Sequence, residues 1–123
     1  MFLLLKHTKL DVYQAARSLA ICCYRLTLQF PDGEKFGMVS QIRRASVSVF
    51  LNISEGASRA SEKDRERFFE IARSSVAELD AAFTLAIELG FLKIGDTEEL
   101  GGLLNRTFQM LSKMIRRREN RQA

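Results

Sequence analysis

The stretch "QIRRASVSVFLNISEGASR", residues 41–59, combines apolar and polar positions with the period of an α-helix. Its apolar residues Ile42, Val49 and Ile53 are separated by seven and four positions, which places them on one helical face. The sequence therefore predicts a helix from about residue 34 to residue 56, with that face turned toward a protein core.

The same apolar period recurs in three further segments. Apolar residues follow one another at three- and four-residue steps along residues 10–30, 61–89 and 97–118, which predicts three more helices. Ser61 and Thr97 stand where N-cap residues are expected, and each is followed by acidic residues in the first turn. Short loops between four such helices favour antiparallel neighbours.

The composition agrees with one globular helical domain. The chain has 123 residues, of which 46% are hydrophobic and 28% charged, a balance typical of folded soluble proteins. No segment shows the sustained two-residue alternation of a β-strand. The sequence therefore predicts an all-α fold, an antiparallel up-down four-helix bundle formed by a single domain over residues 1–123.

The second predicted helix also carries a polar stripe beside its core face. At 100° per residue, six polar residues share one arc: Gln41, Arg44, Ser48, Asn52, Glu55 and Arg59. Val47 and Leu51 lie beyond this stripe, where the core face does not reach. The pattern is typical of a subunit contact, and equally of a partly buried polar face within one bundle.

For the first of these two alternatives, the chemistry of the stripe predicts a structural role. Arg44, Asn52 and Glu55 are expected to form a polar network at or near an interface, with Arg44 in a buried charged pair. Val47 and Leu51 are expected near the same subunit contact. The stripe is not expected to be a catalytic centre.

The positive charge of the chain is concentrated near its C-terminus. The formal net charge is +4, and beyond Arg106 the basic residues face a single acid, Glu119. The predicted phosphate contacts there are Lys113, Arg116, Arg117, Arg118 and Arg121. A second basic cluster, interleaved with acids, comprises Arg59, Lys63 and Arg65. A basic C-terminal end also complements the helix dipole and aids solubility, so the pattern leaves both interpretations open.

The residues needed for enzyme chemistry are sparse. His7 is the one histidine and has no evident partner in the sequence, so the usual acid–base group is missing. Glu78 and Asp80 point to different sides of a helix, which argues against a metal site. No glycine-rich phosphate loop is present. The sequence therefore predicts no catalytic, metal or cofactor site.

The cysteines and the N-terminal segment indicate a cytoplasmic protein. Cys22 and Cys23 are adjacent, a spacing that rarely satisfies disulfide geometry, so both are expected to be reduced. The apolar run after Met1 is too short for a signal peptide core or a membrane span. We expect no membrane partner.

From about Leu10 to Ile115, the chain closely resembles a family of small bacterial four-helix bundles. Its members are often encoded in intervening sequences of 23S ribosomal RNA genes. The resemblance rests on "QIRRA", on the serine and "NISEG" of the second helix, on the arginine and serine that follow, and on "ARSSVAELD".

The resemblance implies both an assembly and a function. Known members form homopentameric rings and are related to accessory proteins that work beside reverse transcriptase in diversity-generating retroelements. The expected function is that of a non-enzymatic oligomer that binds ribosomal RNA or other structured RNA or DNA through basic surfaces, with weak sequence preference. The alternative is an assembly or adaptor protein whose basic end contacts a protein partner such as a reverse transcriptase.

Overall fold

The computed structural model describes the backbone of residues 2–3 and 5–122, and their side chains except those of residues 8–9 and 116–122. The described chain forms four long helices: α1 (Asp11–Thr27), α2 (Met38–Ala57), α3 (Glu62–Glu88) and α4 (Glu98–Gln122). Three short 3-10 turns stand between or before them: η1 (Lys6–Lys9), η2 (Asp32–Glu34) and η3 (Ile94–Thr97). These described residues include no strand, which confirms the predicted all-α class.

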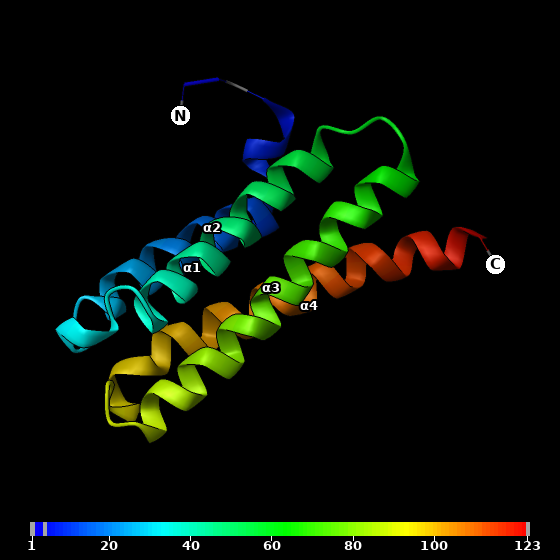
Figure 1. Ribbon diagram of the computed structural model, residues 1–123. Helices are drawn as coiled ribbons and strands as arrows, with labels where there is room; N and C mark the ends of the chain where they lie inside the picture. Colours follow the sequence, from blue (N-terminus) through cyan, green and yellow to red (C-terminus); the bar gives the residue numbers. More distant parts are fainter. Residues whose placement is uncertain (1, 4, 123) are drawn as a thin grey trace.

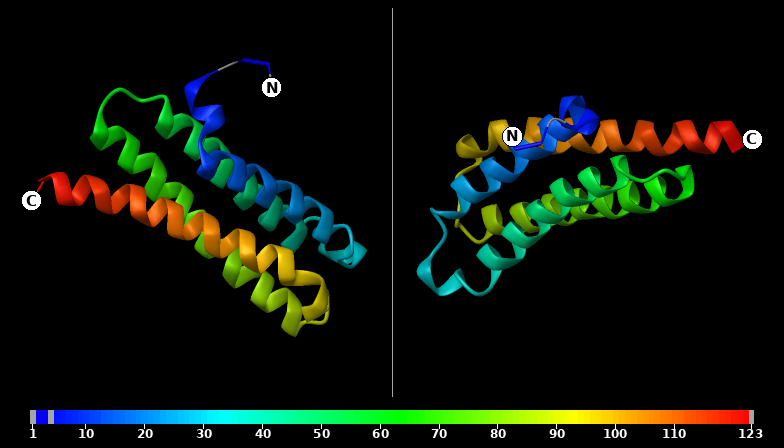
Figure 2. Two further views of the ribbon diagram at one scale, coloured as in Figure 1. Left: turned by 180° about the vertical axis from the view of Figure 1, so that it is seen from behind. Right: turned by 90° about the horizontal axis from the view of Figure 1, so that it is seen from above.

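The helices run up and down around one core. α1 packs against α2 and α4, and α3 packs against the same two helices, so each helix has antiparallel neighbours (Figure 1). One end of the bundle, called here the terminal end, holds η1, the α2–α3 connection and the last turns of α4. The other, called here the loop end, holds the α1–α2 and α3–α4 connections. The views from behind and from above show the same separation (Figure 2).

The predicted apolar faces meet in this core. Several of its side chains are fully buried: Leu19, Ile42, Val49, Ile53, Leu79 and Leu111. Burial of apolar side chains is the dominant favourable contribution to folding, and each buried Leu or Ile contributes roughly 1.5–3 kcal/mol. The periodicity of the sequence therefore located most of the core, although Phe108, which continues the apolar period of the fourth helix, is 41% exposed.

The helix bounds differ from the predicted ones at several ends. α1 ends at Thr27, whose hydroxyl donates to the Cys23 carbonyl at 2.8 Å, and the next residues form a turn. α2 begins at Met38 rather than near residue 34, because Asp32–Glu34 form their own 3-10 turn. The backbone of α4 continues to Gln122.

Local capping chemistry fixes the ends of α3. The Ser61 hydroxyl accepts a hydrogen bond from the Asp64 backbone N–H at 3.1 Å, which confirms the predicted N-cap. Gly90 follows the helix with φ of +80°, a conformation that glycine adopts at little cost. Before α4, the Thr97 hydroxyl donates to the Ile94 carbonyl at 2.6 Å within η3.

Candidate nucleic-acid interface

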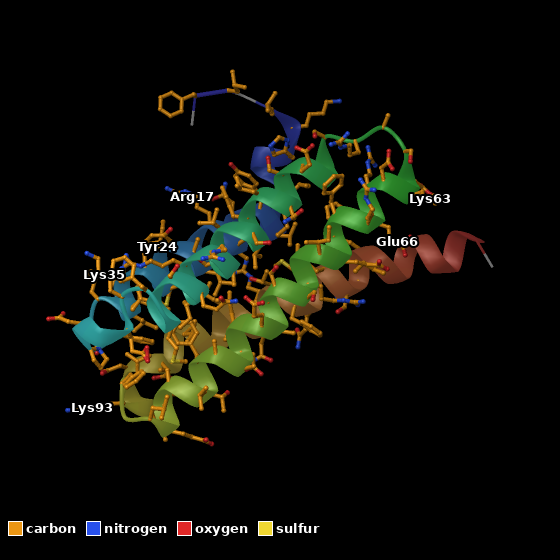
Figure 3. All side chains as sticks on the ribbon, in the orientation of Figure 1. Arg17, Tyr24, Lys35, Lys63, Glu66 and Lys93 are labelled. Atoms are coloured by element: carbon orange, nitrogen blue, oxygen red, sulfur yellow. The ribbon has the colours of Figure 1, made fainter. Side chains whose placement is uncertain are left out.

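The up-down topology brings the two predicted basic clusters to the same end of the bundle. α3 begins at the terminal end and α4 finishes there, so Lys63 and Arg65 share that end with Lys113. Figure 3 shows Lys63 at this end, whereas Lys35 and Lys93 lie at the opposite one. Lys63, Arg65 and Lys113 are exposed. Residues that the sequence separates by some fifty positions thus belong to one surface.

The two ends of the bundle carry opposite charge. The terminal end comprises residues 2–3, 5–11, 55–70 and 113–122, which contain eleven Lys or Arg and seven Asp or Glu. At the loop end, residues 25–38 and 85–99 contain three Lys or Arg and six Asp or Glu. The predicted contacts Arg116, Arg117, Arg118 and Arg121 belong to the terminal end by their place in α4, but their side chains lie outside the described residues.

Contacts of the arginines order the α2–α3 connection. Arg59 forms an ion pair with Glu55 and lies over the ring of Phe68, 4.9 Å from its centroid. Arg67 lies 5.1 Å from the same centroid. Arg65 donates from Nε to the Arg59 carbonyl at 2.7 Å. Arg59 is therefore partly neutralised within the chain.

Gly56 allows the first turns of α3 to approach the end of α2. A Cβ atom at this position would lie 2.8 Å from Cε1 of Phe69 and 3.0 Å from Cβ of Phe68. The absence of a side chain therefore lets both phenylalanines pack against the α2 backbone. This contact fixes the start of α3, and with it the positions of the basic residues on its first turns.

His7 has a partner, contrary to the sequence-based expectation. Its Nε2 lies 3.1 Å from the Ser54 hydroxyl, and its ring packs edge-on against Tyr13 at a centroid distance of 5.5 Å. The fold brings Ser54 to η1 from a distant part of the sequence, which is why no local pattern revealed the pair. The contact ties η1 to α2 at the terminal end.

The polar stripe of α2 lies along the contact with α3. Gln41 donates to the Glu78 carboxylate at 3.2 Å, and the hydroxyls of Ser48 and Ser75 are 2.9 Å apart. Asn52 donates to the Ser48 carbonyl at 2.8 Å. These three stripe residues thus find partners within one chain, as in the second alternative for the stripe.

The network predicted for Arg44, Asn52 and Glu55 is not formed within the chain. Arg44 is exposed and donates to Ser40 at 3.3 Å, so it is not in a buried charged pair. Asn52 and Glu55 likewise contact residues four positions away on or beyond α2. At this four-residue spacing, each of these side chains bonds a neighbour on or just beyond its own helix.

The apolar residues beyond the stripe are uncovered in the single chain. Val47 is 36% exposed and Leu51 is 58% exposed. The register that pairs Ser48 with Ser75 also brings Ile71, itself 43% exposed, level with Asn52. The expected subunit contact at Val47 and Leu51 stays a prediction.

The described residues include no cluster of three or more His, Cys, Asp or Glu that could hold a metal ion. Cys22 and Cys23 are free and buried. Burial raises the pKa of Cys22, and it raises the pKa of Cys23 to about 12. Both thiols therefore stay protonated near neutral pH and are poor nucleophiles or ligands. Within the described helices, none is long and apolar enough to cross a membrane.

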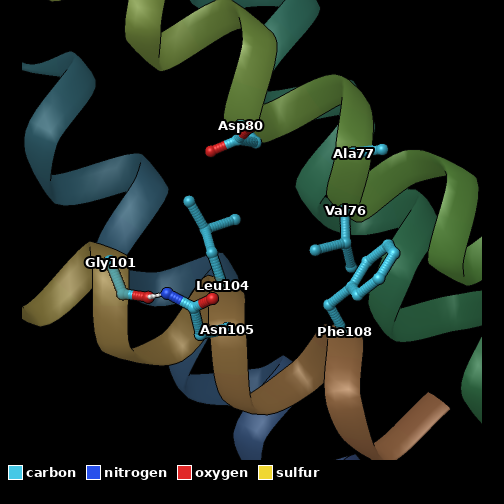
Figure 4. Close-up of a pocket in the computed structure, with 7 residues that line it drawn as sticks. All are labelled: Val76, Ala77, Asp80, Gly101, Leu104, Asn105 and Phe108. Carbon is cyan, nitrogen blue, oxygen red and sulfur yellow. Dashed lines mark hydrogen bonds between the residues drawn. The ribbon is translucent and has the colours of Figure 1, made fainter. Parts of the chain in front are cut away.

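A cavity of about 320 Å³ lies between α3 and α4, away from the terminal end (Figure 4). Val76 and Phe108 form its apolar side, and Asp80 supplies a carboxylate. Asn105 donates to the Gly101 carbonyl at 2.9 Å, as the dashed line in Figure 4 shows. Asp80 makes this cavity unsuited to phosphate.

Residues 8–113 match the family described as 23S rRNA-intervening sequence protein. The chain belongs to this family. The match covers most of the four-helix bundle and confirms the resemblance found in the sequence. Among proteins of curated function, no sequence matches this member of the 23S rRNA-intervening sequence family.

A solved structure supports the same assignment of fold. The chain is similar to a protein of unknown function from the S23 ribosomal protein family of Bacteroides thetaiotaomicron VPI-5482, with a TM-score of 0.76 and 20% identity. The similarity covers 85% of this chain and 97% of that one. At this identity the likeness shows the shared fold alone.

Proposed function

We propose that this protein is a non-enzymatic, oligomeric nucleic-acid-binding protein whose terminal end contacts phosphate groups. The observation that carries the proposal is the convergence of both basic clusters on that end, next to η1. The family's link to the 23S ribosomal RNA intervening sequence supports ribosomal RNA, or another structured RNA or DNA, as the ligand.

The arrangement of charge favours phosphate contact over base-edge reading. Clustered Lys and Arg neutralise phosphates and release counterions, which gives affinity without sequence information. The described terminal end presents η1, the α2–α3 connection and one end of each of the four helices rather than one helix shaped to enter a groove. Weak sequence preference follows.

Assembly of several copies would multiply these contacts. The uncovered Val47 and Leu51 on α2 support a contact between subunits, and the sequence resemblance supports a homopentameric ring. Several terminal ends in one ring can engage one strand together, which raises affinity without any new contact chemistry.

The Ser54–His7 pair does not change the non-enzymatic proposal. Ser54 lies within α2, where the neighbouring backbone N–H groups are used in the helix ladder and cannot form an oxyanion hole. We propose a cytoplasmic location, which the reduced state of Cys22 and Cys23 supports.

The second candidate is an adaptor whose terminal end contacts a protein, such as a reverse transcriptase. The acids between the basic residues favour it, because Glu62, Asp64 and Glu66 leave the start of α3 with mixed charge. A protein surface tolerates such alternation better than a phosphate backbone does.

A salt titration on matched variants tests the proposal. We expect Lys63→Ala with Arg65→Ala to weaken binding of RNA and DNA. The log–log salt slope should flatten by roughly 0.7–0.9 for each phosphate that the variant no longer neutralises. Lys35→Ala with Lys93→Ala removes the same charge from the loop end and should leave both quantities unchanged. The triple change Arg116→Ala, Arg117→Ala and Arg118→Ala should weaken the binding of nucleic acids of unrelated sequence about equally.

Circular dichroism shows whether each variant keeps its helices. Absence of RNA and DNA binding by the parent protein at low salt would contradict the proposal and favour the adaptor. Equal losses from the terminal-end and loop-end pairs would also contradict it, because net charge rather than the terminal end would then govern binding.

A further inference from the structure

A cavity of about 270 Å³ opens at the terminal end, where η1, α2, α3 and α4 meet. It is bounded by residues from these segments and the residue that follows η1: Lys6, His7, Leu10, Ala57, Arg65, Phe69 and Met114. The cavity thus lies within the surface that the proposed function assigns to phosphate contact.

The walls of this cavity are held by contacts already described. The hydrogen bond between His7 and Ser54 fixes η1 against α2, and the Leu10 N–H donates to the His7 carbonyl at 3.1 Å. On the opposite wall, the ring of Phe69 packs against Gly56. The cavity is therefore built by tertiary packing and does not depend on a single loop.

The lining combines an apolar floor with a cationic rim. Phe69 is buried, Ala57 and Met114 are half-buried, and Leu10 is 39% exposed at the edge. Lys6 and Arg65 are exposed. No described lining residue is acidic.

Another cavity, of about 490 Å³, is bounded by Phe2, Leu5, Tyr13 and Arg17 among others. It also has apolar walls and no acid among its described lining residues, but it does not border the basic residues of α3.

Two other cavities lack the combination. The one on the first turns of α3, of about 320 Å³, is bounded by Asp64, Glu66 and Glu70 as well as by Lys63 and Arg67. The α3–α4 cavity contains Asp80. An apolar floor with only positive charge at its rim suits a ligand that joins a flat apolar ring to an anionic group.

We infer that this cavity binds one unpaired nucleobase of a strand whose phosphates lie on the terminal end. A volume of about 270 Å³ is close to the lower limit of small-molecule sites, roughly 300 Å³, and so suits one ring system. Every base presents an apolar face, so insertion requires no particular sequence. The phosphates beside that base then lie near Lys6 and Arg65.

This inference rests on the proposed function and adds a distinction to it. If the protein contacted phosphates alone, its affinity for duplexes and for single strands would depend only on their charge. A base site, in contrast, needs an unpaired nucleotide. The protein should therefore prefer strands with loops, bulges or free ends.

The direct test compares two single-stranded oligonucleotides of equal length on the parent protein. Both have the same number of phosphates. One carries all its bases, and the other has abasic sites in their place. We expect the abasic strand to bind about fivefold or more weakly, because one base contact of this kind contributes at least that much. Equal affinity would overturn the inference.

Two variants with the same chemical change locate the effect. Ala57→Phe fills the terminal-end cavity, whereas Ala77→Phe places the same ring at the α3–α4 cavity. We expect Ala57→Phe to remove the difference between intact and abasic strands and Ala77→Phe to retain it. A retained difference in a folded Ala57→Phe variant would overturn the assignment to this cavity.

The outcomes separate this inference from the proposed function. If the terminal-end charge variants weaken binding while intact and abasic strands bind equally, phosphate contact stands and the base site is wrong. If the parent protein binds vesicles of anionic phospholipid and neither oligonucleotide, both are wrong. If Ala57→Phe does not fold, the comparison of the two strands on the parent protein still decides.

Discussion

The hydroxyl of Ser48 on α2 and that of Ser75 on α3 share a hydrogen bond of 2.9 Å. Asn52 also donates to the Ser48 hydroxyl at 3.1 Å, so Ser48 connects the polar stripe of its own helix to the facing helix. Small side chains at a crossing point let two helices approach closely. This half-buried contact sets the α2–α3 packing and the register that brings Ile71 level with Asn52.

Replacement of Ser75 by leucine should destabilise the bundle more than replacement by alanine. Leucine overfills the crossing and should lower the free energy of unfolding by about 1–3 kcal/mol. Alanine removes one hydrogen bond and should cost about 0.5–1.5 kcal/mol. Urea unfolding followed by circular dichroism measures both. A leucine variant as stable as the alanine variant would show that the helices are not closely packed there.

Gly56→Ala should also destabilise the protein, because the new methyl group would meet the ring of Phe69. Displacement of that ring should cost about 1–3 kcal/mol. Gly102→Ala is the matched control, since a Cβ at Gly102 meets nothing within 4 Å. Within α4 this control should gain roughly 0.5–1 kcal/mol from helix propensity. Thermal or urea unfolding of the two variants should therefore shift in opposite directions.

The exposed strip on α2 predicts self-association. Light scattering at micromolar concentration should give a multiple of 14.0 kDa, five-fold for the proposed pentamer. Leu51→Glu places a charge in the strip and should yield a helical species of lower mass. A parent protein of 14.0 kDa would contradict the proposed assembly.

Arg44→Ala tests whether a second subunit covers Arg44 in the assembled protein or leaves it exposed to solvent. In the single chain Arg44 is exposed, so its removal should change the free energy of unfolding by less than about 0.5 kcal/mol. The same variant should lose mass in light scattering if a second subunit pairs with Arg44. Unchanged mass and unchanged unfolding together would place Arg44 in solvent in the assembly as well.

The two buried thiols should resist modification in the folded protein. The pKa of Cys23 is raised from 9.0 to about 12, so the native state retains a proton that the unfolded state loses above pH 9. Stability is accordingly lost as pH rises from about 9 toward 12, since the unfolded chain then binds fewer protons. A disulfide reagent at pH 8 should react with Cys22 and Cys23 only after denaturant is added. Rapid reaction without denaturant would show local opening of α1.

The sequence alone determined the number and type of helices and most of the core. Ile42, Val49 and Ile53 repeat at helical spacing because each must face the same interior, and spacing along a chain is a local property. The Ser61 cap was predictable for the same reason, since it bonds a backbone group three residues away. The basic clusters were visible too, although as two separate features.

Only the tertiary structure decided which of these residues meet. Ser48 faces Ser75, Ser54 faces His7, and Arg65 reaches the cavity beside Lys6 because antiparallel helices bring distant positions level. The network predicted for the stripe is not formed within the chain, and at a subunit contact it stays a prediction. An exposed side chain such as Arg44 bonds its own helix unless packing offers a nearer partner. Packing across helices depends on the register, and no local period in the sequence specifies that register.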